Sequence, residues 1–98
     1  MENKKKIDDF QIFKQIIGNN LKHIRKEKAK ISQFKLSLLC DIDKNMPSLI
    51  EQASVAIGLE ILYKISKVLK FHPAVIMFHP EKDKDIIDAI NKKYNIFE

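Results

Sequence analysis

Residues 32–51 read SQFKLSLLCDIDKNMPSLIE, and this stretch decides the fold. Ser32 suits a helix N-cap, because its side-chain oxygen can accept a hydrogen bond from the first turn, and residues 33–39 then predict a helix of two turns. Asp41 lies where the chain must leave that helix, and aspartate tolerates the left-handed conformation better than most residues. A second short helix is predicted over residues 44–51. The two segments have the dimensions of a helix-turn-helix.

Pro47 lies inside the second predicted helix and has no backbone N–H to donate. If Asp43 caps a helix that begins at residue 44, Pro47 removes the first intrahelical hydrogen bond. The helix therefore either begins late, with Asn45 as its cap, or has a distorted first turn.

The flanking segments predict further amphipathic helices. Apolar residues recur at steps of three and four within residues 7–24, 59–70 and 83–94. Gly18 lies within the first of these patterns and costs about 1 kcal/mol relative to alanine, so this segment is either one helix or two pieces joined there. A short helix is expected at residues 74–78, between two prolines.

Length and composition limit the class of protein. The 98 residues suffice for one compact domain, and only two glycines and three prolines argue against a turn-rich β-fold. The single cysteine, Cys40, excludes an internal disulfide framework and a zinc cluster built from thiolates. No apolar run is long enough to span a membrane, and no signal peptide is evident. We therefore expect a soluble, cytoplasmic, mostly helical protein with no membrane partner.

Charge is distributed unevenly along the chain. The whole sequence carries a formal net charge of +5, and residues 1–35 contain ten basic and four acidic side chains. The remaining residues contain eight basic and nine acidic side chains. Such an asymmetry predicts that the first third of the chain faces a polyanion such as a nucleic acid.

Motifs for catalysis or metal binding are not found in the sequence. The three histidines, His23, His72 and His79, lack metal-ligand spacing and have no accompanying set of carboxylates or cysteines. No P-loop, nucleophile elbow or dinucleotide fingerprint occurs. We expect no metal site, no cofactor and no enzymatic activity.

The central stretch resembles the lambda-repressor-like or Cro-type helix-turn-helix domains, also called the XRE type. The residues in register with that family are Ser32-Gln33, Leu36-Ser37, Ile42, Ile50-Glu51, the helical pattern from Leu59 to Leu69, and Leu21 to Lys28 with one extra residue before Ile31. The resemblance covers residues 17–78. It implies an all-α, five-helix domain with an N-terminal helical extension in residues 1–16, which begin with a polar tail, and an extra C-terminal helix in residues 79–98.

Four positions depart from the family pattern. The turn glycine of the family is Asp41 here, the glycine after the glutamate is Ala53, and the following proline is Ile57. Pro47 replaces a residue that is usually valine or isoleucine in the helix that reads DNA. These departures concern the shape of that helix more than the fold.

The resemblance implies a sequence-specific DNA-binding transcriptional regulator, a repressor of bacterial or phage type, that inserts helix 44–51 into the major groove as a homodimer. The implied base-reading residues are Lys44, Asn45, Ser48 and Leu49. Asparagine can pair with adenine, lysine can reach guanine, and leucine can contact a thymine methyl group. The expected phosphate contacts are Gln33, Lys28, Lys30 and Lys35. Arg25 and Glu51 are expected to pair and to tie the first helix to the third.

The C-terminal pattern leaves two interpretations open. Ile86, Ile87, Ile90 and Tyr94 either complete the core or form a two-fold dimer interface, and by analogy with the family we favour dimerisation. Two other functions remain as alternatives. One is an antitoxin-type or accessory regulator that binds a small protein partner, and the other is a protein-interaction module on a degenerate helix-turn-helix.

Overall fold

The computed structural model of the protein describes residues 8–95. The α-helices in this range are α1 (Asp9–His23), α2 (Gln33–Cys40), α3 (Met46–Glu51), α4 (Leu59–Leu69) and α5 (Lys84–Lys93), joined by the π-helical segment η2 (Ile24–Ala29) and the 3₁₀ helix η3 (Pro73–Met77). No β-strand occurs among the described residues. The predicted all-α class is thus confirmed: η3 follows α1 to α4 as the fifth helix, and α5 is the extra C-terminal helix. The polar tail predicted at the start of residues 1–16 lies outside the described range.

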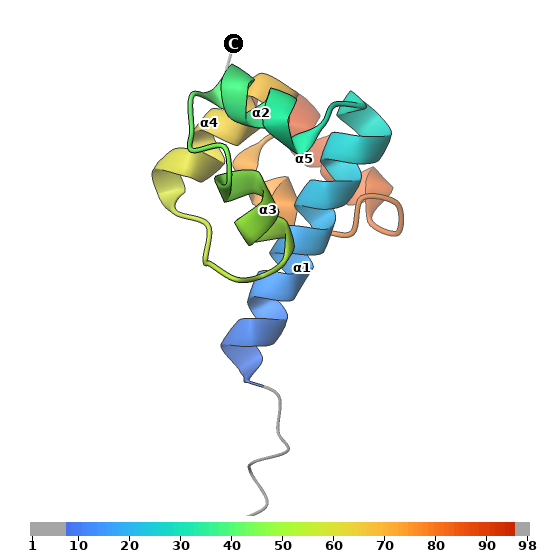
Figure 1. The fold of residues 1–98 in the computed structure, drawn as a ribbon. Helices are drawn as coiled ribbons and strands as arrows, with labels where there is room; N and C mark the ends of the chain where they lie inside the picture. The colour runs from blue at the N-terminus through green and yellow to red at the C-terminus, as the bar shows by residue number, and fades with distance from the viewer. Residues whose placement is uncertain (1–7, 96–98) are drawn as a thin grey trace, which may run out of the picture.

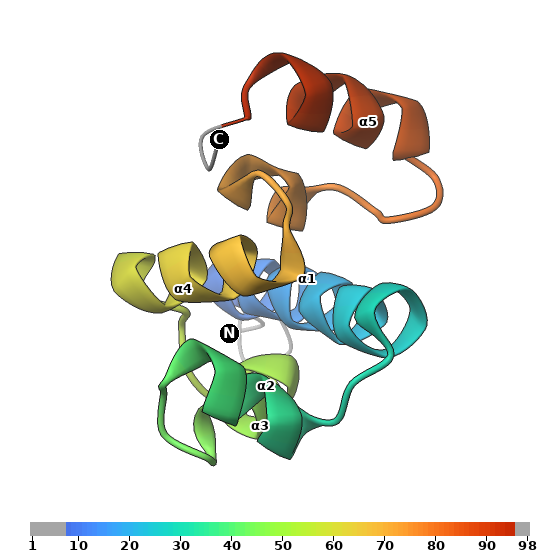
Figure 2. The ribbon, with the colours of Figure 1, turned by 90° about the horizontal axis from the view of Figure 1, so that it is seen from above.

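The helices are arranged in three layers. Figure 2 shows α2 and α3 side by side at one end of the molecule, α1 and α4 in the middle, and α5 at the opposite end beyond η3. Figure 1 agrees, because α2 and α3 lie in front of α1 while α5 lies behind. The α1–α4 layer therefore separates α5 from the helix pair that the sequence predicts to bind DNA.

The core lies where these layers meet. Its most deeply buried side chains come from every layer except the last: Leu21, Leu36, Ile50, Ile65, Val75 and Ile76. No residue of α5 is fully buried, but Ile87 and Ile90 pack against this core. The helix pair and the middle layer are thus firmly joined, while α5 covers the core only in part.

Helix α1 runs without a break through Gly18, so the segment forms one helix and not two pieces. The glycine is required by close packing, because a Cβ atom at this position would lie 2.5 Å from the carbonyl oxygen of Ile50 in α3. The N-terminal extension and the first helix of the domain are therefore one element. Its first half projects beyond the body of the molecule, and Phe10 and Phe13 remain exposed there (Figure 1).

The π-helical segment η2 continues α1 and ends at Lys30, which adopts the left-handed conformation. An α-helix cannot take an additional residue without rotating everything that follows, whereas a π-turn accommodates one within a single wider turn. This segment is where the sequence has one residue more than the family before Ile31. The wider turn absorbs that residue while Arg25, within it, stays buried.

The remaining helix ends follow the predicted signals with small shifts. Gly58 precedes α4 as its N-cap, and residues 83–94 form the slightly shorter helix α5. Residues 74–78 were expected to be a short helix, and the 3₁₀ helix η3 occupies Pro73–Met77. Asn20 of α1 holds η3 in place, since its side-chain Nδ2 donates to the carbonyl of Ile76 at 2.7 Å.

Candidate nucleic-acid interface

The turn between α2 and α3 is built from local backbone interactions. The Ser32 hydroxyl accepts a hydrogen bond from the Lys35 amide at 3.0 Å, as its predicted role as N-cap requires. Asp41 ends α2 in the left-handed conformation with φ of 55°, also as predicted. The next amide, that of Ile42, donates back to the carbonyl of Ser37 at 3.1 Å. The left-handed residue and this hydrogen bond together end α2 and turn the chain toward α3.

The second helix was predicted over residues 44–51, and α3 begins later, at Met46, with Asn45 in the N-cap position. The late start that Pro47 left open is therefore confirmed. Pro47 has no N–H for the carbonyl of Asp43, and the amide of Met46 donates to that carbonyl at 3.0 Å in a tighter turn. The Asp43 carboxylate accepts a hydrogen bond from the Asn45 amide at 2.8 Å. Pro47 lies in the first turn of α3, where a backbone N–H has no intrahelical partner, so it does not unwind the helix, and its ring is buried.

The four predicted base-reading residues are placed in two different environments. Lys44 and Asn45 are exposed and lie in the turn before α3, and not within the helix. Ser48 and Leu49 are half-buried, and the Ser48 hydroxyl accepts a hydrogen bond from Nε2 of Gln52 at 2.7 Å. Lys44 and Asn45 are therefore the side chains of this set with the most freedom to meet a ligand.

Arg25 and Glu51 form a buried, two-pronged ion pair. Nε of Arg25 lies 2.7 Å from Oε2 of Glu51, and one terminal nitrogen of the guanidinium lies 3.0 Å from Oε1. The other terminal nitrogen donates to the carbonyl of Ile31 at 2.8 Å. The pair thus ties the end of the first helix both to the end of α3 and to the segment that leads into α2.

Gln33 joins the same group. Its Nε2 donates to Oε1 of Glu51 at 2.9 Å, so the amide expected to meet a phosphate already has a partner within the protein. The same nitrogen carries a second hydrogen that can donate outward. Its contact with Glu51 holds the Gln33 side chain at the start of α2, next to α3.

The three predicted phosphate-binding lysines are all exposed, but they do not lie together. Lys30 terminates η2 and Lys35 lies in the first turn of α2, so both belong to the segment around the α2–α3 pair. Lys28 lies within η2 and lines a pocket together with residues of α5.

The outward side of α2 carries a feature that the sequence reasoning did not single out. Phe34, Leu38 and Leu39 are 59 %, 61 % and 50 % exposed, which makes this helix apolar on its outer side as well as its inner side. The sequence could have predicted this, because the apolar residues of α2 do not keep to one helical face and some of them must be exposed. Phe34 and Leu38 are four positions apart and are therefore neighbours on the surface of the helix.

The residues predicted for dimerisation divide between two sides of α5. Ile87 and Ile90 pack against the protein's own core. Ile86 and Tyr94 are 49 % and 53 % exposed, and the Tyr94 ring lies edge-on to His72 with 6.3 Å between ring centroids. The helix therefore completes the core with one side, while Ile86 and Tyr94 remain exposed.

Cys40 is buried within the hydrophobic core. Burial raises the pKa of the Cys40 thiol, and the charge of Lys64 opposes that shift. The sulfur lies 3.8 Å from the Lys64 carbonyl, consistent with a small buried side chain. Within residues 8–95, no group of three or more histidine, cysteine, aspartate or glutamate side chains could hold a metal ion. No helix in that range is long and apolar enough to cross a membrane.

Fold and turn together define this protein as a small all-α helix-turn-helix domain. Among curated proteins, the chain is similar to control protein C.BamHI of Bacillus amyloliquefaciens, with 34 % identity over 58 residues that make up 59 % of this chain and 72 % of the relative. The chain belongs to the family of that control protein. No family model matches the chain, and no solved structure matches it.

Proposed function

We propose that this protein is a sequence-specific DNA-binding transcriptional regulator of the lambda-repressor-like type, acting as a repressor and without enzymatic activity or a cofactor. The observation that carries the proposal is the position of Lys44 and Asn45. Both are exposed at the entry to α3, and α3 is fixed by the buried Arg25–Glu51 pair. The relationship to a control protein supports a regulatory role.

In this proposal the start of α3 enters the major groove, which is wide enough for one helix. Lys44 and Asn45 reach base edges first, and Ser48 and Leu49 follow one turn deeper. The α3 helix is only six residues long, so base reading depends on the turn before it as much as on the helix itself. Gln33, Lys30 and Lys35 contact phosphates beside the groove and position the domain without reading sequence.

The test begins with selection of bound fragments from genomic DNA, followed by titration of the selected duplex and a random duplex. Lys44→Ala and Asn45→Ala should weaken binding to the selected duplex by about 1–3 kcal/mol while changing binding to random DNA little. Lys92→Ala is the matched control, because Lys92 is exposed on α5 at the other end of the molecule. If a variant loses the same affinity for the selected and the random duplex, the replaced residue does not read bases.

Salt dependence tests the phosphate contacts. Replacing Lys30 or Lys35 by glutamine should each reduce the slope of log affinity against log salt by about 0.9. Lys28→Gln is the informative comparison, because Lys28 lines the pocket under α5. This substitution should leave the slope of log affinity against log salt unchanged.

We also propose that the regulator forms a homodimer, with Ile86 and Tyr94 as the contact residues on α5. Ile86→Glu should convert the dimer to a monomer in sedimentation experiments without changing the helical content. A dimer that survives this substitution would exclude the outer side of α5 as the interface.

A second candidate function is favoured by the apolar outer side of α2. Phe34 and Leu38 would then bind a protein partner, as in an antitoxin-type regulator or an interaction module. A flat salt response with weak DNA binding would favour the interaction module over the first function. Copurification of a small second protein, lost in Phe34→Ser and Leu38→Ser variants, would favour the antitoxin-type regulator, and its absence would count against it.

A further inference from the structure

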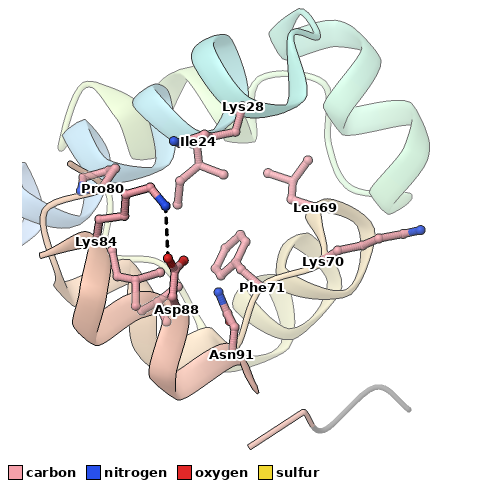
Figure 3. A pocket seen from close by; sticks show the side chains of 11 residues that line it. Ile24, Lys28, Leu69, Lys70, Phe71, Pro80, Lys84, Asp88 and Asn91 are labelled. Carbon is pink, nitrogen blue, oxygen red and sulfur yellow. Dashed lines mark hydrogen bonds and ion pairs between the residues drawn. The ribbon is translucent and has the colours of Figure 1, made fainter. Parts of the chain in front are cut away.

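A pocket lies between the end of the first helix, the end of α4 and the inner side of α5 (Figure 3). Its volume is about 230 Å³. Apolar side chains form its walls: Ile24, Leu69, Phe71, Val75 and Ile87. An apolar cavity of about 150 Å³ can hold benzene, so this pocket has room for an aromatic ring with a short side chain.

Charged groups lie at one end of the pocket. The ammonium group of Lys84 donates to Asp88 at 3.0 Å, and this hydrogen bond raises the pKa of Lys84. Figure 3 shows the ammonium end of Lys28 on the same side, whereas the Lys70 side chain points away from the pocket. Two lysines thus face one carboxylate, which leaves a net positive charge at this end.

Asn91 supplies a neutral hydrogen-bond donor at the other end. Its Oδ1 accepts a hydrogen bond from the His72 amide at 2.7 Å, which fixes the orientation of the side chain. The amide nitrogen therefore points toward Phe71 and the pocket (Figure 3). An apolar body with a few converging polar groups is the usual composition of a small-molecule site.

We propose that this pocket binds a small amphipathic carboxylate, with its hydrocarbon or aromatic body against Phe71 and Leu69 and its carboxylate beside Lys84 and Lys28. The charge of the pocket selects an anion, and its size limits the body to about one ring. The ligand would touch α5, α4 and the first helix at once. This site goes beyond the proposed DNA-binding function and does not depend on it.

The experiment titrates the full chain with 3-phenylpropionate, without DNA, and follows backbone amide signals by NMR. A ligand of this size should bind with a dissociation constant of about 0.1–1 mM and shift the signals of Phe71 and Ile87. The neutral isostere 3-phenylpropanamide, which has the same body, should bind two- to fivefold more weakly, roughly the effect of one partly exposed ion pair. Absence of these shifts at millimolar ligand, or equal binding of the amide, would overturn the proposal.

Single substitutions locate the charge contact. Lys84→Gln should weaken binding of the carboxylate about two- to fivefold and leave binding of the amide unchanged. Lys70→Gln is the matched control, because its stem lines the pocket but its charge points away, and it should have no effect. Asp88→Asn should tighten binding by freeing Lys84, while Glu60→Gln, which removes the same charge from the first turn of α4 and outside the pocket, should not. If Lys70→Gln and Lys84→Gln weaken binding equally, the carboxylate does not lie where we place it.

Discussion

Arg25 and Glu51 face each other in a closed environment, with only 8 % and 3 % of their side chains accessible to solvent. Twenty-six residues separate them in the chain, so the pair joins the first helix to α3 across the fold. A buried pair of this kind gives little net stability when intact, but removal of one partner leaves the other charge buried without compensation.

Glu51→Ala should therefore lower the free energy of unfolding by about 3–5 kcal/mol, a large share of the stability of a domain of this size. The double variant Arg25→Met, Glu51→Leu should recover most of that loss, because no charge is left unpaired. Urea denaturation measures both values. Glu60→Ala, which breaks an exposed ion pair with Lys64 in α4, is the control and should cost about 0.5 kcal/mol or less.

Gly18→Ala should destabilise the protein by about 1–3 kcal/mol, although alanine favours helices more than glycine does. The new methyl group would collide with the backbone carbonyl of Ile50, which cannot move without displacing α3. Thermal unfolding measures the loss. Gly58→Ser is the matched control, because nothing lies within 4 Å of a Cβ atom there and serine is a better N-cap. A neutral Gly18→Ala substitution would show that α1 and α3 are not packed this closely.

Lys70→Gly should stabilise the protein by about 0.5–1 kcal/mol. Lys70 ends α4 in the left-handed conformation with φ of 63°, which is unfavourable for a residue with a Cβ atom and not for glycine. The same exchange one turn earlier, Lys67→Gly, should destabilise by about 1 kcal/mol, because Lys67 lies inside the helix. Chemical denaturation should show that the free energy of unfolding rises in Lys70→Gly and falls in Lys67→Gly. A change in the same direction for both variants would contradict the left-handed conformation at this helix end.

Cys40 should react slowly with iodoacetamide in the folded protein and rapidly in urea. Burial raises the pKa of its thiol, so little of the reactive thiolate is present near neutral pH. Because the folded state holds this proton more tightly than the unfolded state, the associated stability is complete below the ordinary thiol pKa. It is then lost as the pH rises through the raised pKa of the folded state. Stability measured from pH 8 to pH 11 should accordingly fall less in a Cys40→Ala variant than in the parent.

The sequence predicts those parts of the fold that depend on local signals. The Ser32 cap, the left-handed Asp41 and the amphipathic pattern of α4 each follow from residues within a few positions of one another. Pro47 predicts either a late start of the second helix, with Asn45 as its cap, or a distorted first turn, and the late start is confirmed. The sequence alone leaves both open, because either one avoids a hydrogen bond that proline cannot donate.

Other features depend on contacts between residues that are distant in the chain. Gly18 reads as a helix breaker in the sequence, and only its approach to Ile50 shows why it is present. Asn20 is polar, and only the fold shows that it is buried and bonded to η3. The pocket under α5 cannot be predicted from the helix pattern, because its walls come from three separate segments.

The separation of α5 from the α2–α3 pair has a consequence for how copies of the protein assemble on DNA. Two copies joined through α5 would keep their α2–α3 pairs apart, with both α1–α4 layers between them. The angle at which the two α5 helices meet would then set the spacing of the half-sites that the pair can reach, although no residue of α5 touches a base.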